Sequence, residues 1–258
     1  MDIFWIRHST SKSNVSNLYQ RIFDTEKKYY DPELTFEGIK SSLILSKHLP
    51  TELKDIKYVL CSELKRSIQT AILLFPENFL KKKIKICPGV QETGIGFGNI
   101  KKSKKETNIF LFHWCKNLNI FQISDKKLED CIKSLSSDLT KNNWGDILGL
   151  KNVNEERYMN YLIPYLKKRR LKKIVIVSHS LYIRDEIMSP KISRENFRLL
   201  SSDTKLYNNQ ILEKNFIYKD KELELKEEKI FTFGSSYNGK YFYNDVTYNN
   251  FLNNKIEN

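Results

Sequence analysis

Three short apolar runs in this chain each end directly in polar residues that can carry out chemistry. These junctions are residues 3–6 before Arg7 and His8, residues 58–61 before Ser62, and residues 174–177 before Ser178 and His179. A neutral imidazole has a nitrogen lone pair that can attack an electrophile, and a guanidinium can bind two oxygens of a phosphate at once. If the junctions meet in space, the two imidazoles, with Arg7 and Arg66, form a cradle for an anion with a nucleophile inside it.

The elements that must position these residues can be read from the hydrophobic pattern. The apolar runs have the length of buried strands, and a fourth run at 84–87 stops at a Pro-Gly pair. Apolar residues recur at helical spacing after Ser62, a candidate N-cap, in a stretch that Thr35 opens, and over 128–139 and 155–170. This alternation predicts an α/β fold: a three-layer sandwich, with a mostly parallel central sheet and helices on both faces. Ligands of such sheets bind beyond the carboxyl ends of the strands, where the three junctions lie.

The length and the changes of composition along the chain indicate its organisation. At 258 residues it is within the range of one large domain, so we predict a single domain over 1–258. Residues 95–150 are a predicted insertion. From about residue 205 the chain is rich in Asn, Tyr, Lys and Glu, which favours a final edge strand or hairpin, followed by a weakly ordered tail after about residue 240.

The composition favours a basic protein with anionic partners. A formal net charge of +13 and a pI near 9.4 suit a phosphorylated small molecule, nucleic acid or an anionic membrane surface. Nucleic acid is a weak candidate, because the late aromatic and lysine residues follow no RNA-binding pattern. No apolar stretch is long enough to cross a bilayer and no leader is evident, so we expect a cytoplasmic protein that does not act at membranes. The four cysteines lack C-x-x-C spacing and are expected to be reduced core thiols.

Four segments match the motifs of one family, in the order in which that family has them. Residues 7–9 are similar to Arg-His-Gly after a first strand, 31–38 to a Leu-Thr-x-x-Gly helix start, 61–71 to Ser-x-Leu-x-Arg-x-x-Gln-Thr-Ala, and 177–180 to a late Ser-His-Gly. The chain thus resembles the histidine phosphatase superfamily, in its phosphoglycerate mutase-like branch, over roughly residues 1–215. Ser9 and Ser180 depart from the pattern, because the family has glycine at both positions.

The resemblance implies an enzyme that hydrolyses phosphomonoesters through a phosphohistidine. His8 would be the nucleophile, and splitting the displacement into two steps makes each easier. Arg7, Arg66 and His179, assisted by Asn14, would hold the phosphoryl oxygens and offset the charge of the transition state. Neither a metal nor another cofactor is expected. The substrate would be a phosphorylated small molecule or a phosphoprotein, and the oligomeric state is not indicated.

The leaving oxygen needs a proton, and in this branch a glutamic acid soon after the second motif supplies it. Glu92 is the best candidate, because it follows a strand end and lies between glycines. Glu63 or Glu37 could be mistaken for this acid. Asn14 could equally cap the next helix instead of binding phosphate.

Two other functions are compatible with the same residues. A phosphoglycerate-type mutase would use the same phosphohistidine but return the phosphoryl group to product; the sequence after Glu92 lacks the longer pattern typical of such mutases, which favours a phosphatase. A catalytically weak member of the family could instead bind an anionic partner such as nucleic acid with its basic surface, and that binding would depend steeply on salt.

Overall fold

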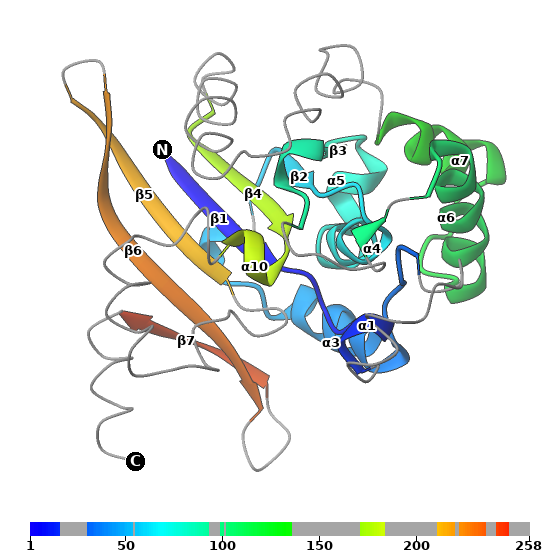
Figure 1. The fold of residues 1–258 in the computed structure, drawn as a ribbon, viewed down its shortest axis with the longest axis horizontal. Helices are drawn as coiled ribbons and strands as arrows, with labels where there is room; N and C mark the ends of the chain where they lie inside the picture. The colour runs from blue at the N-terminus through cyan, green and yellow to red at the C-terminus, as the bar shows by residue number, and fades with distance from the viewer. Residues whose placement is uncertain are drawn as a thin grey trace.

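The computed structural model describes residues 1–15, 30–53, 55–92, 99–100, 102–135, 171–183, 211–219, 222–235 and 241–247. Its strands form one seven-stranded sheet in the order β3-β2-β4-β1-β5-β6-β7 (Figure 1). The strands are β1 (Asp2–Arg7), β2 (Val59–Cys61), β3 (Ile84–Ile86), β4 (Lys173–Ser178), β5 (Ile211–Lys219), β6 (Glu222–Ser235) and β7 (Tyr241–Thr247). The first four are the strands that the apolar runs predict.

The sheet has a parallel part and an antiparallel part. β3, β2, β4 and β1 are parallel neighbours, whereas β5 pairs antiparallel with β1, and β6 and β7 extend this antiparallel edge. The α/β fold with a parallel centre is therefore confirmed. The predicted closing hairpin is present as β5 and β6. Within the segment after residue 240, Tyr241–Thr247 pairs with β6 as a strand, and the weak order expected of this tail stays a prediction.

Helices precede or follow the parallel strands. The helices are α1 (Lys12–Val15), α3 (Phe36–Lys47), α4 (Lys65–Leu74), α5 (Pro76–Leu80), α6 (Lys104–Leu118), α7 (Asp125–Ser134) and α10 (Ser180–Tyr182). Thr35 opens α3 as its N-cap and accepts a hydrogen bond from the amide of Gly38. The prediction that Ser62 caps the next helix is wrong: α4 begins later, with Leu64 at the N-cap position and no side-chain cap of its own.

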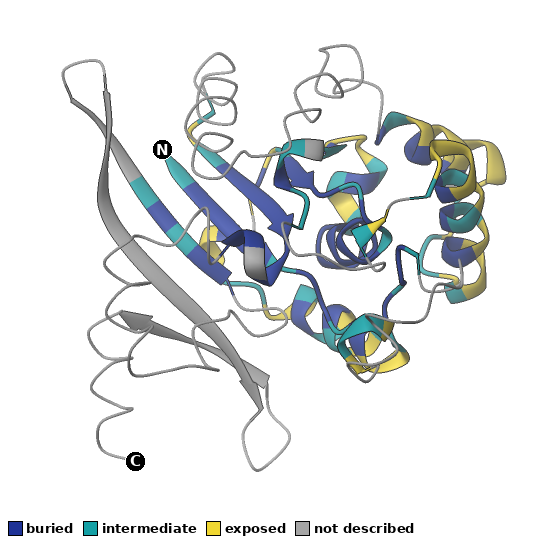
Figure 2. Cartoon of the chain, viewed as in Figure 1, coloured by how far each residue is buried: buried dark blue, intermediate teal, exposed yellow. Residues whose placement is uncertain are grey.

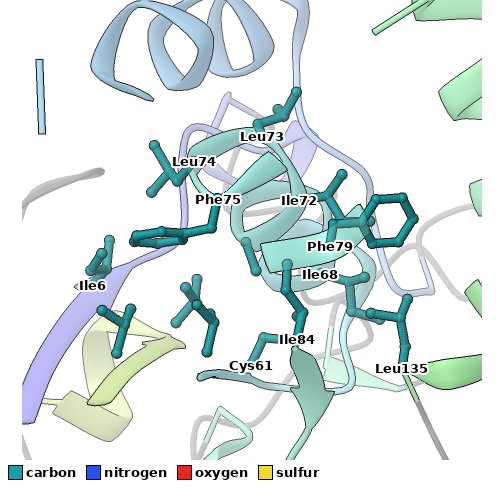
Figure 3. Close-up of a cluster of buried hydrophobic side chains, with 14 of the residues drawn as sticks. Ile6, Cys61, Ile68, Ile72, Leu73, Leu74, Phe75, Phe79, Ile84 and Leu135 are labelled. Atoms are coloured by element: carbon teal, nitrogen blue, oxygen red, sulfur yellow. The ribbon is translucent and has the colours of Figure 1, made fainter. Parts of the chain in front are cut away.

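Both faces of the sheet are buried, which is what a three-layer arrangement requires. Successive side chains of a strand point to opposite faces, and residues 3–6 of β1 and 174–177 of β4 are all 0% exposed (Figure 2). On one face, α4 and α5 pack over the ends of β1, β2 and β3 in a single hydrophobic cluster (Figure 3). On the other face, the ring of Tyr182 from α10 lies 5.9 Å from that of Trp5, measured between centroids. Helices on both faces are thus confirmed.

The predicted insertion contributes α6 and α7, which lie side by side (Figure 1) and bury Leu111 and Ile132 in the same hydrophobic cluster. The four cysteines are free and buried, as expected of core thiols. No helix in the described part of the chain has the length and apolarity needed to cross a membrane. The helix expected over 155–170 lies outside the described residues.

Candidate active site

The three junctions meet because β4 lies between β1 and β2. Arg7, the last residue of β1, pairs with Ser178, the last residue of β4. The amide of His8 donates to the carbonyl of Ser178 over 2.9 Å, and the amide of Ser62 donates to the carbonyl of Val177 over 3.0 Å. The strand order thus brings segments more than a hundred residues apart in the chain together at the carboxyl ends of the parallel strands.

His8 is held as a neutral imidazole whose unprotonated ring nitrogen faces Arg66. Its side chain is only 3% exposed, and Nδ1 lies 2.7 Å from the carbonyl oxygen of Ser9. A carbonyl only accepts hydrogen bonds, so Nδ1 carries the proton and Nε2 keeps its lone pair. Nε of Arg66 lies 3.3 Å from Nε2 and donates to it. Burial, followed by the positive charges of Arg66 and Arg7, lowers the pKa of His8 well below 6.5.

His179 lies beside His8, with 5.0 Å between the ring centroids. The ring is fully buried, and Nε2 is 2.8 Å from the hydroxyl oxygen of Ser62 and 3.3 Å from that of Ser67. Burial, then the charge of Arg66, lowers the pKa of His179 well below its usual value of 6.5. The site therefore holds two neutral imidazoles in contact.

Two guanidiniums and the carboxylate of Glu92 lie around these rings. Burial lowers the pKa of Arg7 to about 10 and also lowers that of Arg66, while the charge of Glu92 raises both, so this carboxylate lies close to both guanidiniums. Nη2 of Arg66 donates to Oδ1 of Asn99 over 2.9 Å. Oε1 of Glu92 accepts a hydrogen bond from the amide of Tyr182 over 3.1 Å, at the short helix α10. The neighbourhood is thus positively charged, with the carboxylate of Glu92 at its side, while the charge of Asp31 also raises the pKa of Arg66.

The described structure brings together His8, His179, Arg7, Arg66 and Glu92, but it commits Asn14 elsewhere. Oδ1 of Asn14 accepts hydrogen bonds from the amide and the hydroxyl of Ser11, each over 2.9 Å. Asn14 lies within α1, so these hydrogen bonds tie its side chain to the residue that precedes this helix. Phosphate binding by Asn14 stays a prediction.

Two buried polar residues on and around α4, Thr70 and Asp31, lie within the matched motifs, but the sequence analysis gave them no role. Thr70 accepts a hydrogen bond from the amide of Ser9 and thereby fixes the loop after His8. Oδ1 of Asp31 accepts from the amide of Lys65 over 2.7 Å, so Asp31 caps α4 from 34 positions earlier in the chain. The sequence held a signal for Thr70, because this residue is the threonine of the matched Gln-Thr-Ala motif.

The two departures from the family pattern do not distort the turns. Among the described non-glycine residues only Asp31, Lys82 and Asn119 have positive φ angles, so neither Ser9 nor Ser180 occupies the left-handed region. The hydroxyl of Ser9 also donates to the carbonyl of Gly38 over 2.8 Å. The extra atoms of Ser9 therefore help to hold α3 against the loop after His8.

Comparisons with known proteins give matches of structure only. No protein-family model and no curated protein matches the sequence. The chain is similar to the α-ribazole phosphatase of Shigella flexneri, with 17% identity, a TM-score of 0.48, and coverage of 88% of this chain and 95% of that chain. It is similar to a phosphoserine phosphatase of Entamoeba histolytica in complex with 3-phosphoglyceric acid, with 19% identity, a TM-score of 0.44, and coverage of 88% and 95%. It is also similar to a phosphoglycerate mutase of Bacillus anthracis, with 18% identity, a TM-score of 0.45, and coverage of 88% and 91%.

These three proteins belong to the superfamily whose motifs the sequence resembles. With identities below 20% and TM-scores below 0.5, the likeness does not extend to an activity or a substrate. The function of this chain therefore has to be argued from its own site.

Proposed function

We propose that this chain hydrolyses phosphomonoesters, without a metal ion, through a phosphohistidine formed on His8. The observation that supports this most strongly is the state of the His8 ring. Its Nδ1 proton is engaged by the carbonyl of Ser9, and its Nε2 lone pair lies 3.3 Å from Nε of Arg66. A phosphoryl group that takes over the Nε–H of Arg66 would free this lone pair and therefore meet an unprotonated nitrogen beside the guanidinium.

In the first step, the Nε2 lone pair attacks phosphorus and the bond between phosphorus and the ester oxygen breaks. The charge on the phosphoryl oxygens is offset by Arg7 and Arg66, which stay charged in spite of burial. The departing oxygen takes a proton from the carboxyl group of Glu92. The bound phosphoryl dianion favours the protonated form of this carboxyl group, because it places negative charge beside it.

In the second step, water attacks the phosphorus of the phosphohistidine. The bond to Nε2 breaks, the electron pair returns to the His8 ring, and Glu92, now a carboxylate, takes the proton of the water. Inorganic phosphate leaves and the enzyme returns to its starting state. A metal ion has no role in either step.

The test compares the wild-type protein with His8→Ala on p-nitrophenyl phosphate, in the presence and absence of EDTA. We expect hydrolysis by the wild type in both conditions, loss of turnover in the variant, and an acid-labile phosphoprotein that only the wild type forms on rapid quenching. His113→Ala, on the exposed side of α6, removes the same ring away from the site and serves as the control.

Hydrolysis by His8→Ala at the wild-type rate would refute the proposal, and so would activity lost in EDTA and restored by added metal. A mutase would be indicated by rapid exchange between the two monophosphoglycerates with 2,3-bisphosphoglycerate present and little free phosphate.

A further inference from the structure

The hydrogen bonds of the His179 ring are separate from the bonds that form and break at His8 and Glu92 in the proposed reaction. Its Nε2 lies 2.8 Å from Oγ of Ser62 and 3.3 Å from Oγ of Ser67. All three side chains are 0% exposed. Nδ1 is also buried, and within the described part of the chain it has no hydrogen-bond partner.

The two serine hydroxyls show which ring nitrogen carries the proton. Oγ of Ser62 already accepts, over 3.4 Å, from the amide of Leu64. Within the described residues, the hydroxyl protons of Ser62 and Ser67 have no acceptor other than Nε2 of His179. If Nε2 carried the ring proton, both hydroxyl protons and the Nδ1 lone pair would be buried without partners. If Nδ1 carries it, Nε2 accepts from a serine hydroxyl, and fewer buried groups are left unsatisfied.

The proton on Nδ1 can then be donated to a bound ligand. It is a buried donor that finds no acceptor among the described residues, on a ring whose centroid lies 5.0 Å from that of His8, beside the charges of Arg66 and Arg7. Leaving a buried donor unsatisfied costs free energy, so a donor of this kind in a native site is explained when a ligand supplies the acceptor.

We propose that Ser62 and Ser67 are positioning residues that hold His179 as the tautomer protonated on Nδ1, so that this N–H donates to an oxygen of a bound phosphoryl group. The proposal rests on the proposed function for the identity of the ligand. It assigns His179 a neutral hydrogen-bonding role, while the two guanidiniums supply the positive charge. The serines act through the imidazole and do not themselves touch the substrate.

The experiment uses protein labelled with ¹⁵N in its histidines and two-bond ¹H–¹⁵N correlation spectra, which distinguish a protonated ring nitrogen from a bare one. At pH 7 the wild type should show His179 protonated on Nδ1 only, and saturating inorganic phosphate should shift the Nδ1 signal without moving the proton to Nε2. Ser62→Ala combined with Ser67→Ala should lose this tautomer preference. It should also lower kcat/KM about 10-fold, because the N–H of His179 would no longer be held in place to donate to the phosphoryl oxygen in the transition state.

Each single variant is measured as well, in case the double variant folds poorly. Ser42→Ala is the matched control, because Ser42 is equally buried but donates to the carbonyl of Gly38 in α3. Three results would each overturn the inference: a wild-type ring protonated on Nε2, an Nδ1 signal unaffected by phosphate, or serine variants that keep both the tautomer and kcat/KM. The spectra can be recorded without turnover. A failure of the proposed hydrolysis, which the comparison with His8→Ala would reveal, can therefore be distinguished from a failure of this inference.

Discussion

Asp31 carries a buried carboxyl group whose ionisation should make the stability of this protein depend on pH. The residue is 1% exposed, and its Oδ1 accepts from the amide of Lys65 at the start of α4. Burial raises its pKa from 3.8 to about 6, although backbone hydrogen bonds from Lys65 and Lys102 and the charge of Arg66 act in the opposite direction. The native state therefore holds the Asp31 proton more tightly than the unfolded chain does.

The magnitude follows from the gap between 3.8 and about 6, which corresponds to roughly 3 kcal/mol at about 1.4 kcal/mol per pH unit. Well below pH 3.8 the carboxyl group is protonated in both states, so its full contribution to stability is present. As the pH rises through 3.8 towards about 6, the unfolded chain ionises while native Asp31 stays protonated. The free energy of unfolding therefore falls, and above the native pKa the contribution is lost.

Asp31→Asn isolates this effect, because asparagine keeps an oxygen that can accept from Lys65 but does not ionise. Urea unfolding of wild type and variant at pH 4 to 8 gives the difference between their free energies of unfolding. We expect the wild type to lose ~2 kcal/mol relative to the variant between pH 4 and pH 7, because the unfolded carboxyl group is already partly ionised at pH 4. Asp130→Asn on the exposed face of α7 controls for the loss of one negative charge. A difference that stays constant, or that changes in favour of the wild type as pH rises, would refute the reasoning.

Three further substitutions test other parts of the site. Arg66→Lys keeps the charge but loses the planar guanidinium beside His8. Because hydrogen bonds from charged groups contribute about 1.5–3 kcal/mol, kcat/KM for p-nitrophenyl phosphate should fall by roughly 100-fold. A loss below about threefold would contradict this. Glu92→Gln should slow hydrolysis of esters with poor leaving groups by about 10²- to 10⁴-fold and spare p-nitrophenyl phosphate; equal loss on both would remove Glu92 from the role of acid. Gly38→Ala would place Cβ 2.1 Å from the carbonyl oxygen of Thr10. Urea unfolding should therefore show a free energy of unfolding that is lower by roughly 1–3 kcal/mol. An unchanged midpoint would show that α3 moves away freely.

The local parts of the site follow from the sequence by itself. The four apolar runs become β1 to β4 at the predicted places, because short buried strands need only a continuous apolar stretch with a polar or turn residue at its end. The helix that Thr35 opens is determined in the same way, by a hydroxyl that accepts from an amide three residues later. Periodicity and caps act between neighbours in the chain, so a pattern of residue types is enough to predict them.

The tertiary structure alone decided how these parts combine. The prediction that Ser62 caps a helix was reasonable for a serine at that position, but its hydroxyl faces His179, 117 residues away, and Asp31 caps α4 in its place. Asn14 shows the converse, because its sequence position allowed both a phosphate ligand and a cap of the next helix, and the fold turns its side-chain oxygen to Ser11. Contacts of this kind depend on the strand order β2-β4-β1, which no local pattern encodes. That order results from burying both faces of the sheet at once, so it is a property of the whole folded chain.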